Sequence, residues 1–506
     1  MDSIGTSVQW AKILDQSRCI GCHACTTACK SENDVPLSVT RTYVKSADVG
    51  TFPSARRAMQ VTRCNQCSNA PCATACPTSA MYVRADGIVD FDKSICIGCK
   101  ACIAACPYDA IFINPDDHSA EKCNFCAHRI DVGLEPACVT VCPVEAILVG
   151  DLNDPESKVA QMVNRDVVAV RRPEKGTNPK VFYKGAHQAT LDPLAAARPE
   201  GGIYAWAEQP HGEGEIGAGH PHSTNSSAAV LLSYDVSHKA PWGWRVSAYT
   251  WTKSIASGTY LVAAGLCMTG VTPWSSSLFR WVAPLVSGAA LAATGVLLIA
   301  DLKHPERFYM IFTRPQWKSW LVRGAFIIAA YSAVLAAHVL ATLAGAKKCQ
   351  RFLAVAGVPL AVATAAYTGY LFAQAKARDL WQNPLLPVHL GVQAKLAGAA
   401  VLLAFVDRRE KAATKTLRLT IAGTAAAHLG FVAVEATLPH VTAHAKLAAR
   451  NLTRGPQRVR FWTGAALVGL ATFAPKIGKW AIPLALAGLA AYEDAYVQAG
   501  QSVPLA

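Results

Sequence analysis

The 506-residue chain is long enough for two or three domains, and its composition changes sharply along its length. It carries 48 Lys and Arg residues against 34 Asp and Glu residues, a formal net charge of +14. These basic residues are scattered and gather mostly between apolar runs, which is typical of membrane flanks and argues against a nucleic-acid-binding protein. Sixteen of the 18 cysteines lie within residues 19–142, whereas the second half is dominated by Ala, Leu, Val and Gly.

The sequence before the first cysteine has no apolar core of signal-peptide length. We therefore expect the cysteines to be synthesised in a reducing compartment, which argues against a disulfide framework. Residues 15–150 show short loops and turns around the cysteines, and the periodic elements are too short for an ordinary core. Bound metal is expected to supply much of the stability of this region.

The cysteines form four motifs in chain order, and three of these motifs end in Cys-Pro. The four groups are Cys19, Cys22, Cys25 and Cys29; Cys64, Cys67, Cys72 and Cys76; Cys96, Cys99, Cys102 and Cys106; and Cys123, Cys126, Cys138 and Cys142. Three thiolates on one tight loop can bind three irons of a cubane, and the last cysteine of a partner motif binds the fourth iron. Gly21 and Gly98 lie inside such loops, where small residues let backbone N–H groups turn toward the cluster sulfurs.

Zinc is the alternative for these cysteines, because CxxC pairs also bind zinc. Zinc usually takes two separated pairs and does not require CxxCxxCxxxC followed by proline, so the spacing favours four 4Fe-4S clusters. After the motifs, residues 150–195 read as a soluble extension, with a helix opening near Asp154 and a short strand at KVFY. Residues 196–245 are rich in Gly, His, Ser and Asn and are expected to form a flexible linker.

The remainder of the chain predicts membrane spans. Uncharged stretches at 254–279, 281–300, 324–346 and 352–375 are each near or above the length needed to cross a bilayer. Four weaker candidates follow: 391–406, which contains Lys395; 419–438, which contains Glu435; 461–475; and 480–492. The sequence therefore predicts eight transmembrane helices.

The cysteine region resembles the four-cluster iron–sulfur subunit of the dimethyl sulfoxide reductase, polysulfide reductase and formate dehydrogenase type. The motifs that carry the resemblance are CIGCHACTTAC, RCNQCSNAPCATACPTSAM, GIVDFDKSICIGCKACIAACPYDAI and KCNFCAHRIDVGLEPACVTVCPVEAILVGDL. It implies two ferredoxin-like units with cross-paired ligands. The implied sets are Cys19, Cys22, Cys25 and Cys142; Cys123, Cys126, Cys138 and Cys29; Cys64, Cys67, Cys72 and Cys106; and Cys96, Cys99, Cys102 and Cys76.

The second half resembles the NrfD or polysulfide reductase membrane-subunit family through DLKHPERFYMIFTRPQWKSWLVRGAF at 301–326. The two resemblances imply an α+β domain of two ferredoxin-like units (1–195), the linker (196–245) and an all-α, eight-helix, quinone-reactive transmembrane bundle without haem (246–498). They also imply a separate catalytic subunit with a molybdenum or tungsten bis-pterin cofactor. This chain would then pass electrons between that subunit and the quinone pool of a bacterial inner membrane.

The predicted quinone site consists of ionisable residues that an eight-span topology places at one membrane face: Lys253, Asp301, His304, His389, Lys395, Glu435 and His440. Ionisable groups inside hydrocarbon are costly and usually functional. Two alternatives remain. A haem b anchor would need two facing histidines, for which His338 and His428 are candidates, and a redox-driven proton pump could use Lys253, Lys395 and Glu435. Because a folded cluster domain without its own signal is difficult to export, the clusters are expected on the cytoplasmic side.

Overall fold

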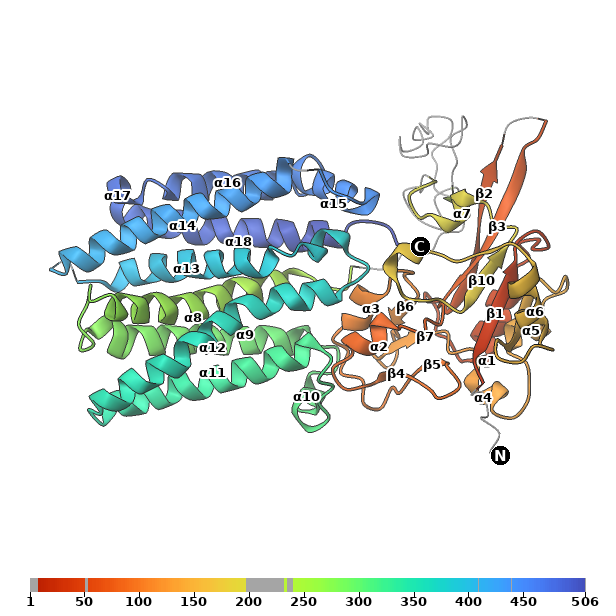
Figure 1. Cartoon of the computed structure of the whole chain (residues 1–506), viewed down its shortest axis with the longest axis horizontal. Helices are drawn as coiled ribbons and strands as arrows, with labels where there is room; N and C mark the ends of the chain where they lie inside the picture. The colour runs from red at the N-terminus through yellow and green to blue at the C-terminus, as the bar shows by residue number, and fades with distance from the viewer. Residues whose placement is uncertain are drawn as a thin grey trace. The chain divides into compact units, whose positions relative to one another are not determined.

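The structure of the protein is a computed structural model. It describes residues 8–50, 53–196, 232–233, 240–407, 409–437 and 439–505. It divides into two units (Figure 1). The cysteine-rich unit comprises residues 1–239 together with 504–506, and the helical unit comprises residues 240–503. Most of the predicted linker, namely 197–231 and 234–239, lies outside the described residues.

Strand β1 (Trp10–Asp15) lies inside the four-stranded sheet of the cysteine-rich unit. It pairs antiparallel with β8 (Ile147–Asp151) and parallel with β10 (Val181–Lys184), and β9 (Val168–Ala169) pairs with β10. Side chains alternate across a strand. Ala11 and Ile13 pack against Val159 of α6 (Lys158–Arg165), whereas Lys12 reaches a cysteine on the other face. The strand predicted at KVFY is confirmed as β10.

Two short hairpins follow the second and third cysteine motifs. Helix α2 (Pro71–Ala75) precedes β4 (Met81–Val83) and β5 (Val89–Phe91), and α3 (Ala101–Ala105) precedes β6 (Ile111–Ile113) and β7 (Ala120–Lys122). Helices and strands of this length are not stable alone. The cysteine side chains themselves form a large part of the buried cluster between these elements.

The remaining elements of the cysteine-rich unit surround this core. Strands β2 (Thr42–Val49) and β3 (Arg56–Arg63) form an antiparallel hairpin, and β11 (Leu232–Ser233) pairs with the outer edge of β2. Short helices carry the first and last cysteine motifs and the end of the soluble extension. They are α1 (Ala24–Glu32), α4 (Ala127–Ile130), α5 (Ala137–Thr140) and α7 (Gln188–Leu191).

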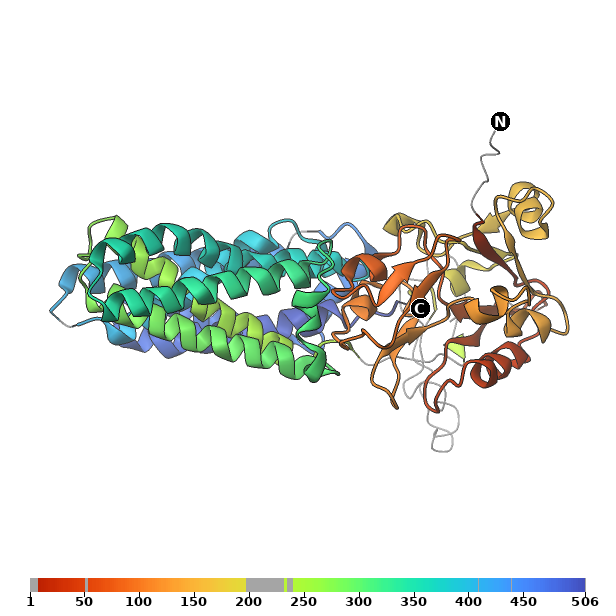
Figure 2. The same ribbon diagram turned by 90° about the horizontal axis from the view of Figure 1, so that it is seen from below.

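The helical unit consists of long helices that run alongside one another, as Figure 2 shows from a second direction. They are α8 (Trp244–Met268), α9 (Ala283–Asp301), α11 (Trp320–Leu343), α12 (Lys347–Gln374), α13 (Leu386–Phe405), α14 (Lys411–Thr437), α16 (Arg458–Ala471) and α18 (Ala481–Gly500). Shorter helices join some of them: α10 (Met310–Thr313), α15 (Ala443–Thr453) and α17 (Ala474–Ile477).

Five of these helices are long and apolar enough to cross a membrane. They are α9, counted together with the helical turn that precedes it from Leu278, and α11, α12, α13 and α14. The chain is thus a multi-pass membrane protein, while the full count of eight spans stays a prediction. Helix α13 is the most enclosed, since 61% of its most apolar stretch is buried, against 28% for α9. Large apolar side chains on the outer helices, such as Val296, Leu340 and Phe352, are exposed, as lipid-facing side chains would be.

The first helix of this unit differs from the predicted span at 254–279. Helix α8 begins at Trp244 and ends at Met268, and a loop that contains Gly270 and Pro273 precedes α9. The first half of α8 carries polar side chains that are nevertheless buried, including Thr250 and Lys253. Both ends of this helix therefore lie about ten residues before those of the predicted span, and α8 is not among the five helices that are apolar enough to count as spans.

Helices α8 and α13 touch at two glycines. A Cβ atom on Gly258 would lie 1.7 Å from the Ala394 carbonyl oxygen, and a Cβ atom on Gly398 would lie 2.0 Å from the Gly258 carbonyl carbon. Small residues let the backbones of membrane helices approach closely in this way. No side chain, however small, can be added at either position without separating the helices.

We expect Gly258→Ala to destabilise the helical unit by about 1–3 kcal/mol, as overpacking does in other cores. Gly265→Ala is the matched control on the same helix, because a Cβ atom at Gly265 meets nothing within 4 Å. The measurement is thermal unfolding of the purified full chain in detergent. Equal unfolding temperatures for the two variants would show that the helices tolerate a wider separation.

Candidate functional site

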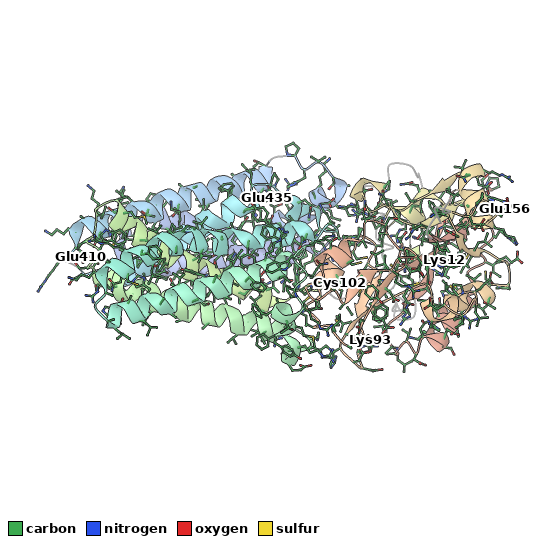
Figure 3. All side chains as sticks on the ribbon, turned by 60° about the horizontal axis from the view of Figure 1, so that its bottom comes forward. Lys12, Lys93, Cys102, Glu156, Glu410 and Glu435 are labelled. Carbon is green, nitrogen blue, oxygen red and sulfur yellow. The ribbon has the colours of Figure 1, made fainter. Side chains whose placement is uncertain are left out.

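Four cysteines line one hollow in the cysteine-rich unit. Cys76, from the end of the second motif, lies there with Cys96, Cys99 and Cys102 of the third motif. Cys102 is labelled in Figure 3. The lining thus contains one of the four ligand sets that the resemblance implies. Thiols spread around a hollow are the arrangement that a cubane cluster requires.

Thiols of the other three sets also lie near one another. Burial raises the pKa of Cys19, Cys29 and Cys106, and a neighbouring thiolate raises it further. These neighbours come from partner motifs: Cys142 acts on Cys19, Cys123 on Cys29 and Cys64 on Cys106. The folded chain therefore brings together the motifs that cross-pairing would join, and the ligand sets themselves stay a prediction.

Backbone amides are directed at several of these sulfurs. The amide of Ala146 donates to Cys142 Sγ at 3.2 Å, and that of Met81 donates to Cys76 Sγ at 3.4 Å. Gly21 and Gly98 have positive φ angles of 69° and 67°, the left-handed region that favours glycine. Hydrogen bonds to cluster sulfurs raise the reduction potential, so these turns would tune a bound cluster.

Two buried cations contact Cys138. Arg63 Nη1 lies 3.1 Å from Cys138 Sγ, and Lys12 Nζ lies 3.7 Å from the same atom. Burial alone would raise the pKa of this thiol, but Arg63 and Lys12 outweigh it and hold the pKa at about 7. The site is therefore built to stabilise a thiolate at Cys138.

Arg63 also has polar atoms that remain without a partner. Its Nε and Nη2 atoms are buried, and no hydrogen-bond acceptor reaches them from the described residues. Unsatisfied buried donors are costly. The inorganic sulfides of an iron–sulfur cluster are acceptors that such donors would fit, so the residues present suit the cofactor that the sequence predicts.

A second network positions Asn33 against two cysteines. Asn33 Nδ2 lies 3.7 Å from Cys29 Sγ and 3.6 Å from Cys126 Sγ. Its side-chain oxygen accepts a hydrogen bond from Arg41, which also forms a buried ion pair of 2.7 Å with Glu121. This chain of contacts fixes the orientation of Asn33.

In the helical unit, α8 carries a buried lysine and faces a buried glutamate. Lys253 is fully buried and donates to the Ala365 carbonyl oxygen at 2.9 Å and to Thr368 Oγ1 at 2.8 Å. Glu493 of α18 accepts a hydrogen bond of 2.7 Å from Thr250, one turn before Lys253. Both charged groups are thus held by hydrogen bonds within the bundle, as burial in hydrocarbon requires.

Two histidines form a second buried group. His389 Nε2 and His428 Nδ1 are 2.8 Å apart, and Tyr492 packs its ring against both imidazoles. Tyr492 and Glu493 are neighbours in α18, so this group lies beside the first. Glu435 is also buried and accepts a hydrogen bond of 3.1 Å from Asn383.

The other predicted site residues are more exposed than these buried groups. Lys395 is exposed on the outer face of α13. Asp301 is half-buried at the end of α9, and His304 pairs with Glu306 at 2.9 Å. His440 contacts the backbone oxygen of Glu435 at 3.1 Å.

The histidines of the haem alternative have different partners. His338 Nδ1 lies 3.0 Å from the Tyr260 hydroxyl, whereas His428 pairs with His389. Sequence reasoning missed Glu493, because the last predicted span ended at residue 492. An acidic residue in a continuous Ala-rich helical pattern was the signal that could have revealed it.

The chain matches three known protein families. Residues 233–475 match the family described as polysulphide reductase, NrfD. Residues 56–152 match the 4Fe-4S dicluster domain, and residues 10–31 match a 4Fe-4S binding domain. The first match covers most of the helical unit, and the other two cover the cysteine motifs.

Characterised relatives are similar to the cysteine-rich unit. A tetrathionate reductase subunit of Salmonella typhimurium is 44% identical over 194 residues, which is 37% of this chain and 76% of the relative. One of the polysulfide reductase chains of Wolinella succinogenes is 43% identical over 177 residues, 34% of this chain and 93% of the relative. The arsenate respiratory reductase iron-sulfur subunit ArrB of a Shewanella species is 34% identical over 219 residues, 34% of this chain and 94% of the relative.

The Glu121 network predicts a pH dependence. Burial opposes ionisation of Glu121, but Arg41, Lys93 and Asn114 outweigh burial and hold the pKa of this carboxyl below its ordinary value. The stabilisation by Glu121 is therefore present at neutral pH and is lost as the pH falls through the lowered pKa. We expect Glu121→Gln to lower the free energy of unfolding by about 3–5 kcal/mol at neutral pH, with a smaller difference from the native chain in acid.

The exposed Glu135 offers the control, since Glu135→Gln removes a carboxylate of the same unit that is in contact with solvent. Unfolding is followed by circular dichroism across the pH range. A constant difference between Glu121→Gln and the native chain at every pH would contradict the assignment.

Proposed function

Because this chain belongs to the family of 4Fe-4S subunits of reductase complexes, here joined to an NrfD membrane domain, we propose that it carries electrons between a catalytic subunit and membrane quinone. The observation that carries the proposal is the placement of the cysteine motifs: Cys76 shares a hollow with three cysteines of the next motif. Bound clusters would supply one-electron transfer, and the protein would set their spacing and potential.

The proposed ligand sets are the cross-paired ones, giving four 4Fe-4S clusters. Cys142 would complete the set of Cys19, Cys22 and Cys25, and Cys29 would complete the set of Cys123, Cys126 and Cys138. The amides directed at Cys76 and Cys142, together with the cations at Cys138, support these positions as sites for thiolates.

The catalytic chemistry is proposed to lie in a separate subunit with a molybdenum or tungsten bis-pterin cofactor. The relatives are named as parts of tetrathionate, polysulfide and arsenate reductases. These names differ in substrate, although the cysteine-rich sequences are similar. We therefore expect the substrate and the direction of electron flow to be determined by the partner subunit.

The quinone site is proposed at the end of the bundle where Lys253, His389 and Glu435 lie. All three are buried, and each comes from a different helix. A narrow hollow beside them is lined by residues that include Thr250, Gln393 and Glu493. Quinone reduction requires proton donors within reach of the ring. Polar side chains in this part of the bundle could supply these protons.

A second candidate function is redox-driven proton pumping. The observation that favours it is the series of buried ionisable groups that extends from Lys253 through Glu493 to the two histidines. Proton uptake per electron, measured in sealed vesicles, separates pumping from quinone reduction alone.

For the orientation of the chain, we propose that the clusters face the cytoplasm of a bacterium.

The cluster proposal predicts about sixteen iron atoms per chain, the ligand count for four cubanes. Cys142→Ser should perturb the cluster bound by Cys19, Cys22 and Cys25, because it removes their fourth ligand. The measurement is iron analysis with EPR-monitored reductive titration of the full chain. The same substitution should leave the signal of the cluster bound by Cys123 unchanged.

Two outcomes would contradict this prediction. Zinc in place of iron would remove the basis of the electron-transfer role. Loss of only the Cys123 cluster in Cys142→Ser would show that the cysteines of the fourth motif bind together and are not cross-paired.

The quinone proposal predicts that Glu435→Gln and Lys253→Met lower quinone-linked turnover by about tenfold or more, since each removes a buried ionisable group. Dye-linked activity of the complex and its iron content should stay near those of the native protein. Lys395→Met provides the matched control, because Lys395 also lies within a predicted span but is exposed.

Normal quinone kinetics in both Glu435→Gln and Lys253→Met would place the site elsewhere in the bundle. Loss of iron in these variants would show a structural role. A large effect of Lys395→Met alone would favour a site on the outer face of α13.

A further inference from the structure

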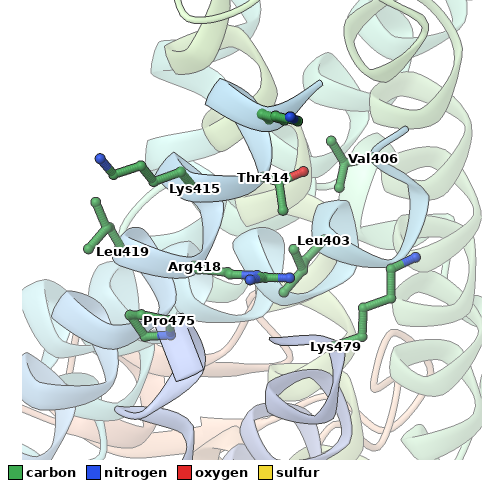
Figure 4. Close-up of a pocket in the computed structure, with 9 residues that line it drawn as sticks. Leu403, Val406, Thr414, Lys415, Arg418, Leu419, Pro475 and Lys479 are labelled. Atoms are coloured by element: carbon green, nitrogen blue, oxygen red, sulfur yellow. The ribbon is translucent and has the colours of Figure 1, made fainter. Parts of the chain in front are cut away.

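The helical unit contains a cavity of about 700 Å³ that the proposed electron transfer does not use. It lies where α13 ends, α14 begins and α17 leads into α18. Its lining comprises Leu403, Val406, Lys411, Thr414, Lys415, Arg418, Leu419, Pro475 and Lys479 (Figure 4). Figure 3 shows Glu410, which directly precedes α14, and Glu435, near the end of α14, at opposite ends of the bundle. The cavity is therefore at the end away from Glu435.

One face of α14 provides the polar wall of this cavity. Lys411, Thr414, Lys415 and Arg418 are spaced by three, one and three residues, which places them on the same side of a helix. The first turn of α14 has no acidic residue, and Glu410, which directly precedes it, does not line the cavity. Cations repel one another and the positive end of the helix dipole in this position. An anion in the cavity would relieve both repulsions.

Two polar groups in the cavity wall are buried without a hydrogen-bond partner among the described residues. These are Arg418 Nε and Thr414 Oγ1. In Figure 4, the guanidinium of Arg418 lies across the middle of the cavity, beside Leu403. The unsatisfied N–H donor and hydroxyl are costly, and a phosphate oxygen would satisfy both with a charge-assisted hydrogen bond.

The remaining walls are apolar and belong to membrane helices. Leu403 lies near the end of α13 and Leu419 lies in α14, both of which are apolar enough to span a bilayer. Lys479 stands at the opposite wall and donates to the Ala404 carbonyl oxygen at 3.3 Å. Of the nine lining residues, four are cationic and none is acidic. Cations beside apolar walls at the ends of spans match a lipid headgroup above its acyl chains.

We propose that this cavity binds the phosphate group of an anionic phospholipid, with the acyl chains lying along the apolar side chains of α13 and α14. Arg418 and Thr414 would contact the phosphate oxygens, and Lys411, Lys415 and Lys479 would add attraction for the negative charge. The phosphate would satisfy the buried donors and offset the repulsion among the cations of α14. The site is independent of the proposed quinone site.

The test uses the full chain purified in detergent, with phosphatidylglycerol as the probe. Native mass spectrometry counts the lipid that stays bound to the native chain and to the triple variant Lys411→Gln, Lys415→Gln and Arg418→Gln. Each cation near a lipid phosphate contributes about fivefold in affinity. We expect the native chain to retain the lipid and the triple variant to bind it with about a hundredfold lower affinity, since three such cations are removed.

The control is Lys347→Gln with Lys348→Gln at the start of α12. These two lysines are exposed and belong to the same end of the bundle, but they do not line the cavity. Retention should equal that of the native chain. Helix content from circular dichroism and iron content should be unchanged in all variants, which separates loss of lipid from loss of folding.

Further probes distinguish the headgroup from other ligands. Phosphatidylcholine, which has no net charge, should not replace phosphatidylglycerol in the native chain. Equal retention of the two lipids, or equal retention by the native and triple-variant chains, would overturn the proposal. If inorganic phosphate alone raised the unfolding temperature of the native chain as much as phosphatidylglycerol did, the site would bind a free anion and the lipid assignment would be wrong.

Discussion

Positive charge buried against cysteine sulfur is the interaction on which the cysteine-rich unit depends. Arg63 and Lys12 both contact Cys138, although each is almost completely inaccessible to solvent. A buried cation without a partner would be strongly destabilising. Thiolates must therefore remain in place for these cations to be tolerated, and the cations in turn stabilise the thiolates. Lys12 belongs to strand β1 and Arg63 ends strand β3, so the two cations come from two different sheets. Their contacts with Cys138 therefore also hold these two strands in place beside the cysteine motifs.

The helical unit must also provide partners for its buried charged residues, although its surroundings are lipid and not water. Lys253 and Glu493 lie in a bundle whose outer surface is apolar, and both are held by hydrogen bonds from within it. The close contact of α8 with α13 at Gly258 and Gly398 leaves no room for water or lipid between these helices. Small residues thus determine where the backbones meet, and polar residues occupy the spaces that remain. In both units contacts from the surrounding structure hold the buried charges named above, although Arg63 and Arg418 each keep a buried donor without a partner among the described residues.

The sequence was sufficient to predict the cysteine motifs, strand β10 and the helical character of the second half, because these depend on local spacing and composition. It was insufficient for the polar interior of the bundle. Helix α8 begins ten residues before the predicted span, at Trp244, and α18 continues to Gly500 through Glu493. Lys253 and Glu493 bounded the two predicted spans, and each has a hydrogen-bond partner on another helix. A hydropathy average over neighbouring residues cannot include such a distant partner.

The orientation of helix faces was equally hidden in the sequence. The polar residues of helix α13 are not confined to one face, so composition could not show that Lys395 faces outward while His389 faces inward. His428 is paired with His389 from α14. The sequence offered His428 only as a haem candidate, because the distance between these helices is a property of the folded bundle.

The partners of Lys253 also determine the order in which the bundle can be completed. During synthesis α8 enters the membrane before α12, which carries Ala365 and Thr368, and before α18, which carries Glu493. Membrane helices insert first and associate afterwards. The nascent chain therefore passes through a stage at which the α8 lysine has no native partner in the bilayer. The bundle reaches its final charge balance only when α18, the last long helix described, has left the ribosome and joined it.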